Sequence, residues 1–193
     1  MSFSTNKNKN ARIKEESMNI QLSGGLGIGP TELAAFDQAL VHAGVANFNL
    51  IYLSSVLPPN SKVKVADKPE KPEGTWGDRL YVVMAQKRTS QRNQEVWAGI
   101  GWIQDPKTKA GLLVEHEGHS EAEVRADIRH SLQALATNRG IEMSAPRMHV
   151  VGGKCTDLPA CALAVAVFES TSWRTARLGS KKLSGLSLSR ASR

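Results

Sequence analysis

Cysteine is scarce in this sequence, which contains only Cys155 and Cys161 among its 193 residues. Two cysteines are too few for a disulfide framework and are typical of a chain that works in a reducing compartment. No uninterrupted apolar run approaches the roughly 18 residues that a membrane span requires. The polar stretch 1–10 also lacks the apolar region of a signal peptide. These absences predict a soluble, cytoplasmic protein without a membrane partner.

Aromatic residues are also few, at 5%, although the net charge of +7 first suggests a nucleic-acid ligand. The first 14 residues hold four basic residues and no acidic one, and the last 24 hold six basic residues and no acidic one. The stretch 15–169 between them is therefore slightly acidic. Nucleic-acid binding usually needs a basic surface interleaved with aromatic side chains. We therefore expect no nucleic-acid partner.

The order of expected elements predicts one α+β domain between two tails. The polar extension 1–17 is expected to be flexible, and the basic, serine-rich stretch 169–193 is expected to be disordered. In the domain 18–168, helices are predicted over 30–43 and 120–139, and residues 61–76 are predicted to form a long loop. The expected strands are 18–22, 48–56, 80–85, 96–103, 112–116, 148–151 and 162–168. Strands that come in runs are typical of the α+β class.

Two stretches that often indicate a cofactor or metal do not have the required spacing. In the glycine-rich stretch 24–29, a dinucleotide motif that uses Gly25 and Gly27 would need glycine at position 30, which is Pro30. A flexible connection between strand and helix is expected there. His116 and His119 are not accompanied by further ligands at recognisable spacing, so no metal site is predicted.

Two other features could each be structural or functional. In helix 30–43, Leu33, Phe36 and Leu40 predict the buried stripe, and Asp37 falls about 60° from its centre. An acid there is unfavourable unless it is paired, so Asp37 forms a structural salt bridge or receives a cationic ligand. The pair Ser54-Ser55 ends the expected strand 48–56, a position where serine is common.

Several segments together resemble the pyruvoyl-dependent arginine decarboxylases. The specific ones are 27–33, 35–40, 43–47 and 49–59, and the later segments 81–85, 99–101 and 111–115 follow in that family's order. The likeness covers about residues 18–168. It implies a layered αββα-type sandwich with mainly antiparallel strands.

The resemblance also implies a proenzyme that cuts itself between Ser54 and Ser55. The Ser55 hydroxyl attacks the Ser54 carbonyl, the resulting ester is eliminated, and loss of ammonia leaves a pyruvoyl group. The products are a β chain, 1–54, and an α chain, 55–193, that carries the pyruvoyl group. Its carbonyl forms a Schiff base with L-arginine and accepts electrons that no ordinary side chain can delocalise, giving agmatine and carbon dioxide. Strain and polarisation are expected at the bond between the serines.

Roles for further residues follow from the same resemblance. Asn49 matches an asparagine associated with self-processing, and Glu115 matches the acid proposed to protonate the decarboxylated carbon. Asp37 becomes the expected partner of the arginine guanidinium, which a carboxylate can bind through two parallel hydrogen bonds. Further contacts with the substrate are expected from Leu33, Gly44 and Val56.

The spacing of two of these residues bears on the assembly. In a straight strand Asn49 and Ser55 would lie roughly 20 Å apart. Either the chain bends near Leu53, or Asn49 of one subunit serves Ser55 of another. The family forms trimers, sometimes paired into hexamers, with active sites between subunits. Two alternatives to arginine decarboxylation stay open: the same chemistry on another amino acid, and an uncleaved scaffold or binding protein. The physiological role, either polyamine synthesis or acid resistance, also stays open.

Overall fold

The computed structural model describes residues 17–66, 69–140 and 142–173. Along this part of the chain the elements are, in order, β1 (Asn19–Ile28), α1 (Glu32–His42), β2 (Asn49–Tyr52), β3 (Val56–Leu57), β4 (Lys62–Val65), β5 (Arg79–Thr89), β6 (Glu95–Gln104), β7 (Gly111–Gly118), α2 (Glu121–Arg139), β8 (Arg147–Lys154) and β9 (Ala160–Thr171). Most of the predicted flexible extension 1–17 and most of the predicted disordered tail lie outside the described residues.

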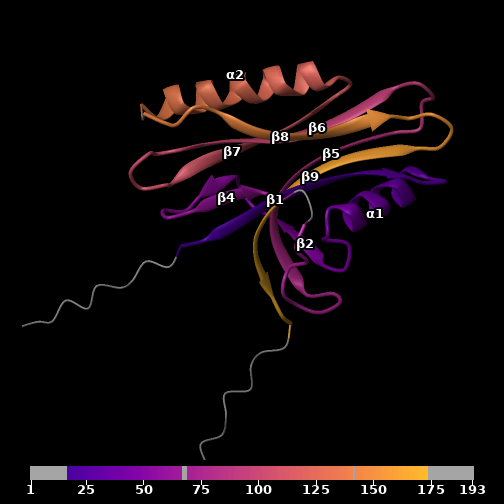
Figure 1. The fold of residues 1–193 in the computed structure, drawn as a ribbon, viewed down its shortest axis with the longest axis horizontal. Helices are drawn as coiled ribbons and strands as arrows, with labels where there is room; N and C mark the ends of the chain where they lie inside the picture. The colour runs from indigo at the N-terminus through magenta and orange to yellow at the C-terminus, as the bar shows by residue number, and fades with distance from the viewer. Residues whose placement is uncertain (1–16, 67–68, 141, 174–193) are drawn as a thin grey trace, which may run out of the picture.

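The strands form two sheets that lie between two helices (Figure 1). The described strands of one sheet have the order β2-β5-β9-β1-β4, and those of the other have the order β3-β7-β6-β8. Helix α1 packs on β1 and β9 of the first sheet, and α2 packs on β6 and β7 of the second. Pairing is antiparallel except between β1 and β4 and between β2 and β5. The predicted α+β class is confirmed, with two packed sheets and few helices.

Glycines in β1 allow α1 to approach the first sheet closely. The stretch 24–29 is not the flexible connection that was predicted, because β1 continues through it to Ile28. A Cβ atom on Gly27 would lie 1.9 Å from the Ala35 carbonyl oxygen, and one on Gly25 would lie 2.6 Å from that of Ala39. The glycines are therefore explained by backbone-to-backbone packing.

Helix α1 presents its alanines to that sheet. Ala35 and Ala39 are fully buried, whereas Leu33, predicted to belong to the buried stripe, is 68% exposed. The prediction for Leu33 is wrong because the near contact with β1 admits only small side chains on the buried face of the helix. The helix ends as predicted before Gly44, whose φ of 79° is favourable only without a Cβ atom.

Helix α2 follows the sequence signals closely. The Ser120 side chain accepts a hydrogen bond from the Glu123 N–H, and Gly140 ends the helix in the left-handed conformation. Val124, Ile128 and Leu132 are buried against the second sheet. Neither α1 nor α2, the helices of the described residues, has the length and apolarity needed to cross a membrane.

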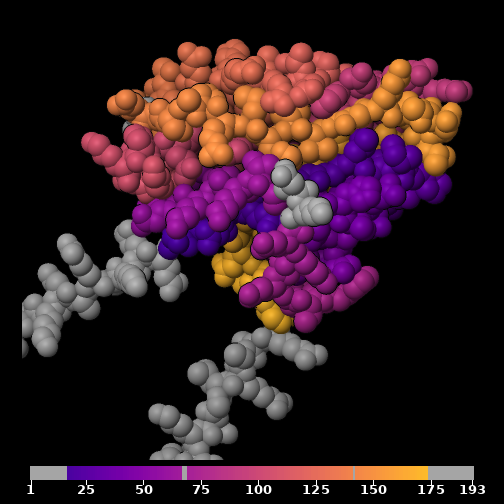
Figure 2. Space-filling view, viewed as in Figure 1, coloured from indigo at the N-terminus to yellow at the C-terminus, as the bar shows by residue number. Residues whose placement is uncertain are grey.

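Two segments are more regular than the sequence suggested. Strand β4 forms inside the predicted loop 61–76, because it pairs in parallel with β1. Strand β9 continues to Thr171, so the first residues of the predicted tail 169–193 belong to the first sheet. In the space-filling view the yellow end of β9 emerges at the lower edge beside the magenta segment near residue 75 (Figure 2).

Candidate active site

The chain passes from one sheet to the other at Ser54 and Ser55, and we call this segment the crossing. Strand β2 ends at Tyr52 in the first sheet, and β3 begins at Val56 in the second. The predicted continuous strand over 48–56 is therefore wrong. The chain does bend near Leu53, which was one of the two alternatives that the spacing of Asn49 and Ser55 left open.

Backbone hydrogen bonds hold both sides of this crossing. The Leu53 N–H donates to the Val82 carbonyl of the first sheet at 2.9 Å, and the Leu113 N–H of the second sheet donates to the Ser55 carbonyl at 2.9 Å. Between these anchors Ser55 has a φ of 55°, which is unfavourable for a residue with a Cβ atom. The backbone is thus strained directly beside the bond between the serines.

The Ser55 hydroxyl contacts a carboxylate of the second sheet. Its Oγ donates a hydrogen bond to Glu115 Oε1. Glu115 lies within β7, opposite Ile100 of β6, and is half-buried. The structure therefore brings together two residues that the sequence places 60 positions apart.

This pair can activate an oxygen nucleophile. A hydroxyl that donates to a carboxylate can transfer its proton as its oxygen forms a new bond. The strained conformation of Ser55 raises the free energy of the intact backbone at the same place. The arrangement therefore has the two properties that an intramolecular attack on the preceding peptide bond needs: a proton acceptor and a destabilised ground state.

A cavity of about 390 Å³ opens beside the crossing. It is lined by Met18, Leu53, Ser54, Val56, Pro58, Tyr81, Phe168, Glu169 and Thr171. Val56, a predicted substrate contact, is 55% exposed here. Glu169 supplies the only carboxylate among the described residues that line the cavity. Glu169 was not predicted as a site residue because the domain was expected to end at Phe168, whereas β9 continues to Thr171.

Asn49 does not contact Ser55 within one chain. It lies at the start of β2, where its Nδ2 donates to the Gly77 carbonyl at 2.5 Å. Its side chain is exposed. Although the chain bends near Leu53, the Asn49 amide and the Ser55 hydroxyl therefore form hydrogen bonds with different partners.

The expected substrate-binding residues of α1 also lie apart from the crossing. Asp37 and Leu33 are exposed, and neither they nor Gly44 belong to the described residues that line the cavity. The expectation that Asp37 would lie beside the buried stripe is wrong, because the buried face of α1 is formed by Ala35 and Ala39. Asp37 needs no structural salt bridge in this position, since water solvates its carboxylate.

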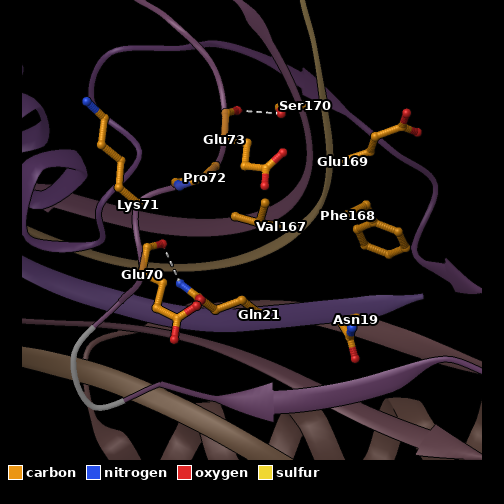
Figure 3. A pocket seen from close by; sticks show the side chains of 10 residues that line it. All are labelled: Asn19, Gln21, Glu70, Lys71, Pro72, Glu73, Val167, Phe168, Glu169 and Ser170. Carbon is orange, nitrogen blue, oxygen red and sulfur yellow. Dashed lines mark hydrogen bonds between the residues drawn. The ribbon is translucent and has the colours of Figure 1, made fainter. Parts of the chain in front are cut away.

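A further cavity of about 460 Å³ contains none of the predicted site residues. It lies between the end of β9 and the segment 70–73, and Figure 3 shows the side chains that line it. The Gln21 side chain donates to the Glu70 carbonyl at 3.0 Å, and the Ser170 hydroxyl donates to that of Glu73 at 2.5 Å. These hydrogen bonds join the segment 70–73 to β1 on one side and to β9 on the other.

The histidines that the sequence analysis weighed as metal ligands have other contacts. His116 Nε2 lies 2.8 Å from Ser131 Oγ, and His119 Nδ1 lies 3.2 Å from the Glu95 carbonyl oxygen. In the ranges 17–66, 69–140 and 142–173, no group of three or more His, Cys, Asp or Glu side chains is placed to hold a metal ion.

Comparison with known proteins relates most of the chain to one family. A family model described as pyruvoyl-dependent arginine decarboxylase matches residues 19–172. The match includes both sheets, the crossing at Ser54 and Ser55, and Glu115.

Individual proteins with that name show the same relationship. The one from Methanococcoides burtonii is 37% identical over 125 residues, which cover 63% of this chain and 69% of the relative. The one from Thermoplasma volcanium is 37% identical over 100 residues, covering 51% of this chain and 54% of the relative. The one from Halobacterium salinarum is 42% identical over 98 residues, covering 50% and 58%. These matches thus span from about half to about two thirds of the length of the three relatives.

Proposed function

Because the chain belongs to the pyruvoyl-dependent arginine decarboxylase family, we propose that it cuts itself between Ser54 and Ser55 and decarboxylates L-arginine to agmatine and carbon dioxide. The observation that carries the proposal is the hydrogen bond from the Ser55 hydroxyl to Glu115, made beside a strained backbone where the chain passes between the sheets. The names of the relatives support arginine as the substrate.

Self-processing uses groups that the chain itself supplies. The Ser55 Oγ attacks the Ser54 carbonyl carbon while Glu115 accepts the hydroxyl proton. The bond from that carbon to the Ser55 nitrogen then breaks, Glu115 returns the proton to the nitrogen, and the amide becomes an ester. Removal of the Ser55 α-proton then breaks the ester bond to Oγ, so that residues 1–54 leave with a terminal carboxylate. Addition of water and loss of ammonia from residue 55 complete the pyruvoyl group. Release of the left-handed conformation at Ser55 favours these steps.

In the uncut chain, residue 55 lies between Ser54 and Val56, which line the cavity, and contacts Glu115. The pyruvoyl carbonyl supplies the electron acceptor that decarboxylation of an amino acid requires. Glu115 is half-buried and close enough to position 55 to deliver a proton to the substrate carbon. Val56 lines the cavity beside it and would contact the aliphatic part of the substrate.

The remaining site residues support a shared active site in a homo-oligomer, as a trimer or a hexamer. Leu33 and Asp37 lie on the exposed side of α1, and Val56 is exposed beside the crossing. In such an assembly Leu33, Asp37 and Gly44 of one subunit would meet the cavity of another. Asp37 would bind the guanidinium group there, and an Asn49 amide would donate to the Ser54 carbonyl.

Two other functions make different predictions. The same chemistry on another cationic amino acid would also give two fragments, but a different amine. An uncleaved relative that acts as a scaffold or binding protein would give one full-length band and no amine. Glu169 beside the cavity favours a cationic ligand in general and does not distinguish arginine from lysine.

The test is denaturing electrophoresis and intact-mass measurement of the purified chain, followed by carbon dioxide release from a panel of amino acids. We expect fragments 1–54 and 55–193, the second with a pyruvoyl mass, and agmatine from arginine. Ser55→Ala should give one full-length band and no agmatine. Ser54→Ala is the matched control, since it keeps the nucleophile and should still be cut. Two bands from Ser55→Ala would reject the assignment.

A further inference from the structure

One backbone carbonyl accepts hydrogen bonds from two side chains that are distant in sequence. Asn49 Nδ2 donates to the Gly77 carbonyl at 2.5 Å, and Trp173 Nε1 donates to the same oxygen at 2.9 Å. Trp173 follows the end of β9 at Thr171 and lies just beyond the region 19–172 that the family model matches. The yellow end of β9 lies beside the magenta segment near residue 75 in Figure 2. The end of the described chain therefore meets the amide of Asn49 at a common acceptor.

The turn that carries this carbonyl is also attached to the backbone around Asn49. The Gly77 N–H donates to the Asn47 carbonyl at 2.8 Å, and the Asn49 N–H donates to the Asp78 carbonyl at 2.8 Å. Gly77 has a φ of 83°, which a residue without a Cβ atom adopts at low cost. A shift of Gly77 or Asp78 would therefore move both the backbone and the side chain of Asn49.

The carboxylate of Asp78 holds this turn closed. Asp78 is 6% exposed, and its Oδ2 accepts hydrogen bonds from the Thr75 N–H at 2.9 Å and from the Thr75 hydroxyl at 3.1 Å. The Ser172 side chain and the Trp173 N–H also donate to the carboxylate. These hydrogen bonds, led by that of the Thr75 N–H, lower the pKa of Asp78 and keep it ionised. One carboxylate thus joins the turn to the end of β9.

Arg79 fixes Trp173 from the other side. Its Nη2 donates to the Ser172 carbonyl at 2.8 Å, and its guanidinium lies 4.5 Å from the centre of the Trp173 ring. Such stacking holds the indole in one orientation. The Trp173 Nε1 therefore points at Gly77 even though the side chain is 64% exposed.

We propose that Asp78 and Trp173 are positioning residues that orient the Asn49 amide for self-processing. The proposal rests on the proposed function, in which that amide serves the bond between Ser54 and Ser55. Directing one N–H to Gly77 fixes the plane of the amide group, so that its second N–H points in one direction. A preorganised donor is worth more than a mobile one, because no free energy is spent on ordering it as the oxyanion forms.

The test follows cleavage in time after cell-free synthesis with labelled methionine, using denaturing electrophoresis. Asp78→Asn keeps the size of the side chain and removes its charge, and Trp173→Phe keeps a ring over Arg79 and removes the N–H. We expect both to slow cleavage, Asp78→Asn by about 10- to 100-fold, as for a reacting group misplaced by about 1 Å. The matched control is Asp105→Asn, because Asp105 accepts from the Lys107 and Thr108 N–H groups in a turn remote from Asn49.

A second readout separates positioning from a general structural role. Each substitution is combined with Asn49→Ala, and cleavage is followed for long enough to measure the slow rate of the Asn49→Ala chain. A residue that acts through the Asn49 amide adds no further slowing once the amide is gone, whereas independent effects multiply. We expect no further slowing from Asp78→Asn in the Asn49→Ala chain.

The outcomes distinguish this inference from the proposed function. A wild-type chain that stays uncut rejects the proposed function, and the positioning role with it. A wild-type chain that is cut, with Asp78→Asn cut at the same rate or multiplying the effect of Asn49→Ala, overturns the positioning role alone. If Asp78→Asn does not fold, as judged by its thermal denaturation, the Trp173→Phe pair decides the matter by the same criteria.

Discussion

Ser55 donates a hydrogen bond from its hydroxyl group to Glu115. It directly precedes β3, the edge strand of the second sheet, and Glu115 lies in the neighbouring strand β7. The contact forms because β3 pairs antiparallel with β7, so the short strand after the serines lies beside the longer strand that carries the acid. The sharp turn at Ser55, where φ is 55°, directly precedes this pairing. Nucleophile, proton acceptor and strain thus lie together where the chain enters the second sheet.

The first prediction concerns the proton acceptor. Glu115→Gln keeps the shape of the side chain but cannot take up a proton, so we expect self-cleavage to slow by about 100-fold or more. Glu117→Gln is the matched control, since Glu117 lies on the same strand and forms an ion pair with Lys87 at 3.8 Å instead of contacting Ser55. Timed electrophoresis measures both. Equal cleavage of the two variants would show that Glu115 is not the acceptor.

The second prediction concerns the strain at Ser55. Neither Ser55→Gly nor Ser55→Ala can be cut, so their free energies of unfolding in urea can be compared directly. We expect the glycine chain to be more stable by about 1 kcal/mol, because glycine adopts a positive φ without the cost that a Cβ atom adds.

The control for this strain is the neighbouring serine. Ser54 is not among the described residues with positive φ. Ser54→Gly and Ser54→Ala, both made in the Ser55→Ala chain, should therefore show the opposite order of stability. An alanine chain that is the more stable at both positions would contradict a strained Ser55.

Local signals in the sequence predicted the helices well and the strand ends less well. Ser120 and Gly140 set the ends of α2 through contacts within the helix itself, so the sequence alone suffices to place them. The stretch 24–29 was misread because its glycines serve a contact between β1 and α1, which only the folded chain contains. The strand over 48–56 was misread because β5 and β7, which divide it between two sheets, lie far along the chain.

The candidate site divides in the same way. Ser54, Ser55 and Glu115 were identified through family resemblance, and the structure joins the last two. Glu169 and Trp173 were missed because they follow the apparent end of the domain, and their relevance depends on where β9 finishes. Pattern and spacing contain no information on such contacts between distant segments.

The third prediction concerns the pH dependence of stability. Burial raises the pKa of the Cys161 thiol from 9.0 to about 11, although Arg88 opposes the shift. The unfolded chain therefore releases this proton at lower pH than the folded chain does. The contribution of the neutral thiol to stability should be complete below pH 9 and be lost as the pH rises toward about 11. Urea unfolding at several pH values should show a steeper decline for the wild-type chain than for Cys161→Ala; equal slopes would contradict the shift.

The fourth prediction concerns substrate recognition by Asp37. A hydrogen bond to a charged group contributes roughly 1.5–3 kcal/mol, so Asp37→Asn should raise the KM for arginine by about 10- to 100-fold. Self-cleavage should be unchanged, because Asp37 on α1 is proposed to bind the guanidinium group of the substrate, which takes no part in cutting the chain. Asp127→Asn on the exposed side of α2 is the matched control. Agmatine formation measures the effect, and an unchanged KM would remove Asp37 from the binding site.

The fifth prediction concerns the sharing of Asn49 between subunits. In one chain its amide donates to Gly77 while Ser55 contacts Glu115, and the proposed function has a neighbour's amide serve each cleavage bond. Asn49→Ala chains have an intact Ser55, and Ser55→Ala chains have an intact Asn49. When the two are co-expressed, mixed assemblies should cut the Asn49→Ala chain rapidly, although Asn49→Ala alone is cut slowly and Ser55→Ala alone stays whole. Mass tags on the two chains identify the fragments. A mixture that is cut no faster than Asn49→Ala alone, with the wild-type chain cut normally, would show that each chain uses its own asparagine.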